Sequence, residues 1–201
     1  VVSAGPVTDH IELLPKLEEL GAAALVLPSL FEEQIEHHEW QVHLLDEYGA
    51  DSFAEAPTYL PRLDDHRIGP DAYLRKIEAA KKAVSIPVIA SLNGNSPGGW
   101  VHYAKLFEAA GADAIELNIY LLPSDPQQTG SNIEERYLDL VRAVRAEVDR
   151  PLAVKIGPYF SSIPSMGARL LEAGADGLVL FNRFVHPDID LEAMDVAPKL
   201  E

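Results

Sequence analysis

A chain of 201 residues, 47% hydrophobic and 24% charged, is long enough to bury a sizeable core, so we expect a single domain over residues 1–201. Its formal net charge of −16 argues against nucleic-acid partners, and its lack of cysteine excludes disulfides, thiolate metal sites and a cysteine nucleophile. No apolar run reaches the length of a membrane span and no signal-peptide pattern opens the chain, so we expect a cytoplasmic protein without a membrane partner.

The predicted secondary structure begins with a strand and then alternates between helices and strands to the end of the chain. The predicted strands cover residues 1–5, 24–29, 87–92, 113–119, 151–156 and 177–182. The predicted helices cover residues 10–20, 70–84, 99–110, 132–148 and 165–173. A long insertion is predicted at about 30–75, after the second strand, where it could form a lid, a substrate-binding element or an oligomer contact.

One phrase recurs along the chain, as ELGAAALVLPSLF, EAAGADAIELNIY and EAGADGLVLFNRF. Each copy runs from a helical segment through a glycine into a short apolar run. The three glycines are Gly21, Gly111 and Gly174. Glycine at such a position can adopt the left-handed conformation that ends a helix. The phrase therefore predicts repeated helix-to-strand junctions.

Strict alternation of this kind predicts parallel strands joined by right-handed crossovers. No Gly-x-Gly-x-x-Gly sequence opens a helix after the first strand, which disfavours a dinucleotide-binding sheet. The sequence therefore predicts an α/β fold of the (β/α)8 TIM-barrel type with only about six βα units, a partial barrel. Residues 183–201 hold no further βα unit, and the HPDIDLE segment at 186–192 is interpreted as a loop with capping carboxylates. Both ends look cut relative to a complete barrel.

Polar side chains lie at or near the carboxyl ends of the predicted strands. They are Ser3, Ser29, Asn93, Asn118, Lys155 and Asn182. Barrel active sites are built at this end, so we expect the six side chains to converge there. Taken alone, each also has a structural interpretation, because an amide at a strand end can satisfy loop backbone groups and a lysine there can belong to a salt bridge.

Four segments carry a resemblance to a known family: PVIASLNG, GADAIELNIY, PLAVKIGP and EAGADGLVLFNRFVHPDIDLE. They resemble the dihydroorotate dehydrogenase family, in its dihydroorotate dehydrogenase-like branch of flavin barrels. The likeness runs through nearly the whole chain and is strongest over 87–192. It implies an FMN-dependent oxidoreductase of pyrimidine biosynthesis that acts on a CH–CH bond of a small-molecule substrate by hydride transfer.

The resemblance also implies cofactor-binding roles for residues at the strand ends. They are Ala4, Gly5, Asn93, Asn118, Lys155 and Asn182. Lys155 matches the family lysine that approaches flavin N1 and O2, and it is also the predicted catalytic residue. Asn182 matches an asparagine near the substrate. Independently of the family, a fixed ammonium stabilises the negative charge that reduced flavin carries around N1.

The chain also departs from the family pattern. Leu121 stands at the position of the family's Cys or Ser base and cannot take a proton, which argues against dihydroorotate itself. Pro28 or Ser29 replaces a lysine after the second strand. The seventh and eighth strands that hold the FMN phosphate are absent, so we expect weak FMN binding and a homo-oligomer or a marginally stable chain.

Two other functions stay open from the residues alone. The first is a non-catalytic barrel that binds a small ligand, and the second is a lyase that uses Lys155 as a Schiff-base nucleophile. The catalytic acid or base is unassigned, and the nearby hydroxyls are Ser96, Tyr120 and Ser124.

The predicted insertion holds further candidates. Glu33, His37 and His38 are interpreted as a solvated helix and not as a metal site, since no third ligand follows at standard spacing. Tyr59 and Arg62 could contact a substrate or pack over the barrel rim.

Overall fold

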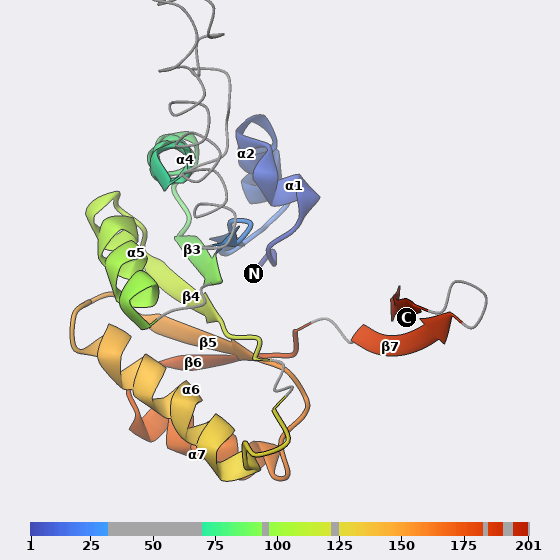
Figure 1. Cartoon of the computed structure of the whole chain (residues 1–201). Helices are drawn as coiled ribbons and strands as arrows, with labels where there is room; N and C mark the ends of the chain where they lie inside the picture. Colours follow the sequence, from blue (N-terminus) through green and yellow to red (C-terminus); the bar gives the residue numbers. More distant parts are fainter. Residues whose placement is uncertain (32–69, 94–96, 122–124, 183–184, 191–194, 201) are drawn as a thin grey trace, which may run out of the picture.

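The computed structural model describes residues 1–31, 70–93, 97–121, 125–182, 185–190 and 195–200, and its centre is a parallel sheet (Figure 1). The strands are β1 (Leu25–Val26), β2 (Leu30–Phe31), β3 (Val88–Asn93), β4 (Ala114–Asn118), β5 (Leu152–Ile156) and β6 (Gly177–Leu180). Strands β3 to β6 are neighbours in chain order, and both β1 and β2 pair with β3. Every pairing in the sheet is parallel, and Val2 adds a parallel bridge to Leu25. The predicted parallel strands in chain order are confirmed.

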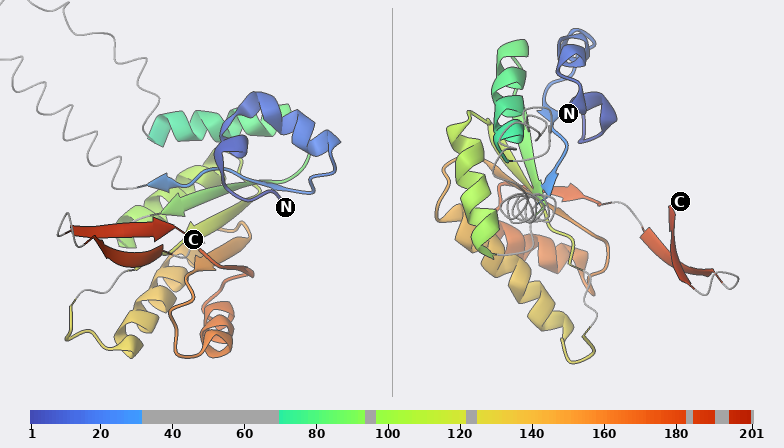
Figure 2. Two further views of the ribbon diagram at one scale, coloured as in Figure 1. Left: turned by 90° about the vertical axis from the view of Figure 1, so that its right-hand side faces the viewer. Right: turned by 45° about the horizontal axis from the view of Figure 1, so that its top comes forward.

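Helices cover one face of the sheet, and the opposite face is open on the side of the C-terminal hairpin (Figure 2). The helices are α1 (Pro6–Asp9), the 3₁₀ helix η1 (Ile11–Leu13), α2 (Leu14–Glu19), α4 (Pro70–Ala83), α5 (Pro97–Ala109), α6 (Gly130–Arg145) and α7 (Ile163–Glu172). Helices α4, α5, α6 and α7 pack against one another in chain order. The curved sheet and its outer helices form a partial (β/α) barrel, as predicted.

The core lies between the sheet and the helices. Alternate side chains of each strand point toward the helices, as the pleat requires. On the central strands these side chains are fully buried: Val88, Ala90, Leu92, Ile115, Leu117, Leu152, Val154 and Ile156. Phe107 of α5 and Val141 of α6 meet them from the helix layer. Burial of this apolar surface stabilises the sheet and fixes which side chains are left for the opposite face.

The helix-to-strand junctions form as the repeated phrase predicts. The glycines at these junctions, Gly21, Gly111 and Gly174, have φ values of 92°, 93° and 114°. Gly174 is constrained further, because a Cβ there would lie 2.5 Å from Cγ of Arg145. At this position both the backbone conformation and the available space require glycine.

The N-terminal part differs in detail from the prediction. The predicted strand at 1–5 is reduced to the single bridge at Val2, and the chain enters α1 at Pro6. The predicted helix at 10–20 is split into η1 and α2, and Pro15 lies in the first turn of α2. Proline suits a helix start and has no N–H for a helix interior, which explains the break.

The C-terminal segment differs more. Residues predicted as a loop form β7 (Val185–Asp190), which pairs in antiparallel register with β8 (Asp195–Leu200). Figure 1 shows this hairpin apart from the barrel sheet. The interpretation of 186–192 as a loop was therefore wrong for residues 186–190, although no further βα unit occurs among the described residues after β6. Of the predicted insertion, residues 32–69 lie outside the described part of the chain.

Candidate active site

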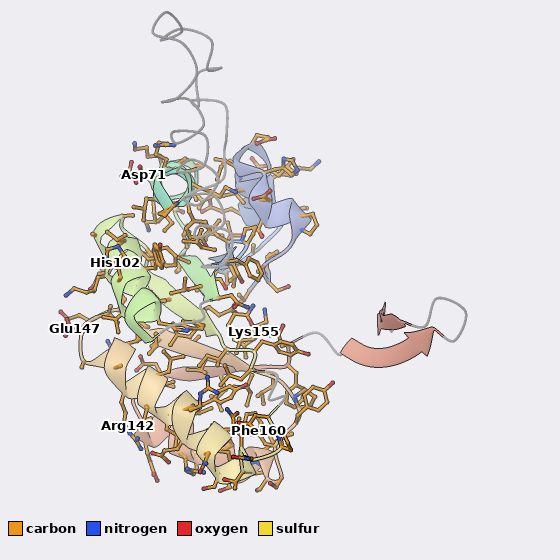
Figure 3. The ribbon with its side chains drawn as sticks, viewed as in Figure 1. Asp71, His102, Arg142, Glu147, Lys155 and Phe160 are labelled. Atoms are coloured by element: carbon orange, nitrogen blue, oxygen red, sulfur yellow. The ribbon has the colours of Figure 1, made fainter. Side chains whose placement is uncertain are left out.

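The open face of the sheet carries polar side chains near the carboxyl ends of its strands. Ser91 of β3 lies opposite Glu116 of β4, and Asn118 of β4 lies opposite Lys155 of β5. Residues paired in this way share a face, and these alternate with the buried helix-facing residues. Figure 3 shows Lys155 on the open side of the sheet, whereas Arg142 and Glu147 lie out on the helix side.

Ser29 joins this face because the chain between β1 and β2 contains one extra residue. Val26 pairs with Ile89, but Leu30 pairs with Leu92, so four steps on one strand match three on the other. Such a bulge reverses the facing of every residue after it. Pro28, which has no N–H for the ladder, lies within it. The bulge places Ser29 level with Ser91 instead of turning it toward the helices.

Tyr73 of α4 fills the gap that the bulge leaves in the ladder. Its hydroxyl donates to the carbonyl oxygen of Ser91 at 3.1 Å and accepts from the Ser91 N–H at 3.0 Å. Both backbone groups are thereby satisfied without a partner strand. Burial raises the pKa of the Tyr73 hydroxyl well above its ordinary value. A neutral tyrosine is what this geometry needs, since the hydroxyl must donate as well as accept.

A chain of hydrogen bonds links side chains from different strands. The two hydroxyl oxygens of Ser29 and Ser91 are 2.8 Å apart, and Ser91 Oγ donates to Glu116 Oε1 at 2.8 Å. Asn118 Nδ2 donates to Ser29 Oγ at 3.3 Å, and Asn182 Nδ2 donates to Asn118 Oδ1 at 2.6 Å. Four of the predicted strand-end side chains therefore lie together in one cluster. They are Ser29, Asn118, Asn182 and Lys155, the last of which joins the cluster through its ion pair with Glu116.

Glu116 is the acidic residue of this cluster. It is 3% exposed, in the middle of β4, and its Oε1 lies 3.6 Å from Nζ of Lys155. A carboxylate this deeply buried is costly unless it is paired and hydrogen-bonded, and here both conditions are met. The sequence prediction did not include Glu116. A lone acidic residue between Ile115 and Leu117 in a buried strand was the available signal.

The remaining predicted site residues lie further along the strand ends. Asn93 ends β3 opposite Phe31, on the face that Ser91 shares. Ala4 and Gly5 follow the Val2 bridge, and Gly5 caps α1 with an extended backbone. The Gly5 N–H donates to Thr8 Oγ1, which donates back to the Gly5 carbonyl, so this turn is held locally. Ser3, also predicted at this end, is exposed.

Other candidates are placed less centrally or lie outside the described residues. Tyr120 is half-buried at the end of β4. Ser96, Ser124, Tyr59 and Arg62 lie outside the part of the chain that the structure describes, as do Glu33, His37 and His38. Within the described part, no group of three or more His, Cys, Asp or Glu side chains could hold a metal ion.

Comparison with known proteins finds curated relatives of this chain. No family model matches the chain. A dihydroorotate dehydrogenase B (NAD(+)) catalytic subunit of Pyrococcus abyssi is 30% identical over 199 residues, which is 96% of this chain and 61% of the relative. The corresponding subunit of Pyrococcus furiosus is 32% identical over 127 residues, 61% of this chain and 40% of the relative.

The chain is similar to dihydroorotate dehydrogenases along almost its whole length. The resemblance seen in the sequence is thus confirmed, and it extends along almost the full chain. A further relative, from Methanocella arvoryzae, is 28% identical over 95% of this chain and 60% of its own length. The chain spans about three fifths of the length of the relatives that it matches from end to end.

Solved structures support the barrel at the level of fold. A dihydrodipicolinate synthase of Rhodopseudomonas palustris superposes with a TM-score of 0.57 at 14% identity, over 90% of this chain and 54% of that one. A second, from Agrobacterium tumefaciens, gives 0.53 at 18% identity, over 88% of this chain and 52% of that one. These neighbours are TIM-barrel proteins, and at such low identity they show the fold alone.

The strand-end residues suit one part of the flavin that the dihydroorotate dehydrogenase family implies. The polar edge of an isoalloxazine ring presents carbonyl oxygens and ring nitrogens, which take hydrogen bonds from an ammonium and from amides. Lys155, Asn118 and Asn182 offer these groups within one cluster. The described residues after β6 form the β7–β8 hairpin. The described residues fit the ring edge of FMN.

Leu121 differs from the family pattern in the structure as in the sequence. Its side chain is aliphatic and packs against the core, and its backbone N–H donates to the hydroxyl of Tyr137 at 3.3 Å. Burial raises the pKa of Tyr137, which keeps this hydroxyl neutral. The position to which the resemblance assigned a Cys or Ser base therefore serves packing in this chain.

Proposed function

We propose that this chain carries the flavin-facing half of an FMN-dependent oxidoreductase that moves a hydride to or from a CH–CH bond of a small molecule. The observation that supports this most directly is the ion pair of Lys155 with the buried Glu116, beside the linked amides of Asn118 and Asn182. The family relationship supports the same class of reaction. A cytoplasmic location stays a prediction.

The roles of the residues follow from their chemistry. FMN supplies a hydride acceptor or donor at its N5 when it is bound. Lys155 would place a fixed positive charge at the N1 and O2 edge, where reduced flavin is negative, and so favour the reduced form. Asn118 and Asn182 would hydrogen-bond flavin or substrate carbonyls. Ala4 and Gly5, with no bulk beyond a methyl group, would leave room for the ring near the first strand.

Dihydroorotate is not the substrate that these residues favour. Removing a proton from carbon needs a base, and Leu121 cannot provide one. We therefore propose a different small molecule. Of the hydroxyl groups named from the sequence as candidate acids or bases, Tyr120 is the one that lies in the described part of the chain.

The Schiff-base alternative is less well supported. A Schiff-base nucleophile must be a neutral amine. The pairing of Lys155 with a buried carboxylate suits an ammonium instead. Borohydride treatment in the presence of pyruvate tests this directly, since a covalent adduct on Lys155 would establish a lyase-type site and contradict the present proposal.

The deciding experiment is titration of the purified chain with FMN, followed by absorbance and by quenching of flavin fluorescence. We expect saturable binding that weakens in Lys155→Met and is unchanged in Lys105→Met. Lys105 is a matched control because it lies on α5 and pairs with Glu147, just after the end of α6, on the helix side of the sheet. In the bound flavin, Lys155→Met should lower the reduction potential, because reduced flavin loses about 1–3 kcal/mol of charge-assisted hydrogen bonding. No flavin binding by the wild-type chain would overturn the proposal in favour of a non-catalytic barrel.

A further inference from the structure

The hydrogen-bond chain on the open face has a fixed direction, and the carboxylate of Glu116 sets it. Glu116, as a carboxylate, can only accept, so the hydrogen bond from Ser91 Oγ uses the one hydroxyl proton of Ser91. The hydrogen bond of 2.8 Å between the two serine oxygens must then use the proton of Ser29. Ser29 Oγ is left to accept, and Asn118 must present its NH₂ group to it.

The same count of donated protons also fixes the orientation of the Asn182 side-chain amide relative to Asn118. Since Asn118 turns its nitrogen toward Ser29, its oxygen faces Asn182, which donates from Nδ2 at 2.6 Å. The reverse orientation of Asn118 would leave the two serine oxygens 2.8 Å apart with no proton between them. The orientation of both strand-end amides therefore depends on a carboxylate that is 3% exposed and lies one layer deeper in the sheet.

We infer that Glu116 is a positioning residue for the proposed flavin or substrate site. It orients Asn118 and Asn182 through Ser29 and Ser91, and it holds the ammonium of Lys155 through an ion pair. This inference rests on the proposed function for the identity of the ligand, but the orientation of the amides is a property of the chain alone. Glu116 touches no ligand in this role and acts through its neighbours.

The carboxylate and the relay can be separated by two substitutions. Glu116→Gln keeps the shape but can donate to Ser91, which frees the serine protons to point the other way and removes the charge beside Lys155. Ser91→Ala keeps the charge and interrupts the relay. Glu147→Gln is the control, since it removes one carboxylate from an outer ion pair with Lys105.

The measurements are made on the full chain without added flavin. In ¹⁵N-labelled protein, the side-chain NH₂ signals of Asn118 and Asn182 are assigned by substituting each asparagine. We expect both pairs of signals to move in Glu116→Gln and in Ser91→Ala, and to stay in place in Glu147→Gln. Competitive acetylation followed by mass spectrometry reports on Lys155, which should react several-fold faster only in Glu116→Gln. If Glu116 had only a structural role, the amide signals would not move in both variants while the acetylation of Lys155 changed in Glu116→Gln alone.

The result that overturns the inference is unchanged Asn118 and Asn182 signals in Glu116→Gln, or Lys155 labelling equal to that of wild type. Circular dichroism melts identify a variant that fails to fold, in which case Ser91→Ala decides the relay alone. FMN titration of the wild type is a separate readout. Amide signals that move in a chain that binds no FMN would support the positioning role and reject the flavin, whereas FMN binding with unmoved signals would do the opposite.

Discussion

Nζ of Lys155 lies 3.6 Å from Oε1 of Glu116, and the two side chains are 16% and 4% exposed. The lysine thus reaches the open face from β5, while the carboxylate beneath it is shielded by the strands on either side. The two charges have different environments, so removal of one is not equivalent to removal of the other.

Loss of the lysine should destabilise the fold. Removing one partner of a fully buried pair costs about 3–5 kcal/mol. Here the separation is long and Ser91 still donates to Glu116, so we expect Lys155→Met to lower the free energy of unfolding by about 1–3 kcal/mol. Urea unfolding measures this. The double variant Lys155→Met with Glu116→Gln should regain most of the lost unfolding free energy, because no unpaired carboxylate is left buried. If the double variant is no more stable than Lys155→Met, the carboxylate of Glu116 does not need the ammonium of Lys155.

Tyr73 should contribute to stability through the backbone of Ser91. In Tyr73→Phe, the buried N–H and carbonyl of Ser91 lose their common partner, which should cost about 1–3 kcal/mol of unfolding free energy. Tyr159→Phe is the control, because Tyr159 is 60% exposed and a surface change of this kind is worth at most about 0.5 kcal/mol. Equal midpoints for the two variants in urea would contradict the role given to Tyr73.

The tyrosine hydroxyls predict a sensitivity to alkali. The pKa of Tyr73 in the folded state is raised by burial above its ordinary value of 10.0, and that of Tyr137 is raised for the same reason. The unfolded chain therefore releases these protons at lower pH than the folded one, so stability is fully present below pH 10.0 and falls as the pH rises above it. Urea midpoints between neutral pH and pH 11 measure the slope, which should be shallower in Tyr73→Phe.

The cofactor should be held by its ring and not by its phosphate in this chain. The residues that suit a flavin lie at the ends of β4, β5 and β6, and the described residues after β6 form the β7–β8 hairpin. We therefore expect riboflavin and FMN to bind with similar and weak affinity. Parallel fluorescence titrations decide this, and a strong preference for FMN would reveal a phosphate site in the chain.

Association of the chain with itself is also expected. In the described part of the chain, β6 pairs with β5 and with no second strand, and Leu180 and Phe181 at its end are 52% and 37% exposed. An apolar open edge favours pairing with another copy. Analytical ultracentrifugation should show concentration-dependent dimers that weaken in Leu180→Lys. A monomer at all concentrations would rule out this edge as an interface.

Much of the barrel could be predicted because its signals are local. Strands β3, β4 and β5 lie within one residue of the predicted ranges, since proline or a helix-ending glycine marks where each begins. The β7–β8 hairpin was missed because HPDIDLE carries proline and several carboxylates, which are typical of loops.

The site was predicted in part for the same reason. Asn118, Lys155 and Asn182 are strand-end residues and could be found from the repeating pattern. Tyr73 could not, and for Glu116 the sequence offered only a lone acidic residue in an apolar strand, since the roles of both depend on which residues lie opposite each other in the sheet. The facing of Ser29 depends on a bulge, and a bulge depends on the pairing of two strands that are distant in sequence.

That bulge makes the spacing between Val26 and Leu30 as important as the identity of the residues in it. A substitution there would alter one side chain. The deletion of one residue would restore an even register with β3, in which Ser29 still lies opposite Ser91, but the bulge and the gap in the ladder that Tyr73 fills would be lost. Natural relatives that keep a tyrosine at the position of Tyr73 should therefore vary in the residues of this short segment while conserving its length. In a sequence alignment of such relatives, a gap between the positions of Val26 and Leu30 would therefore mean more than a substitution there.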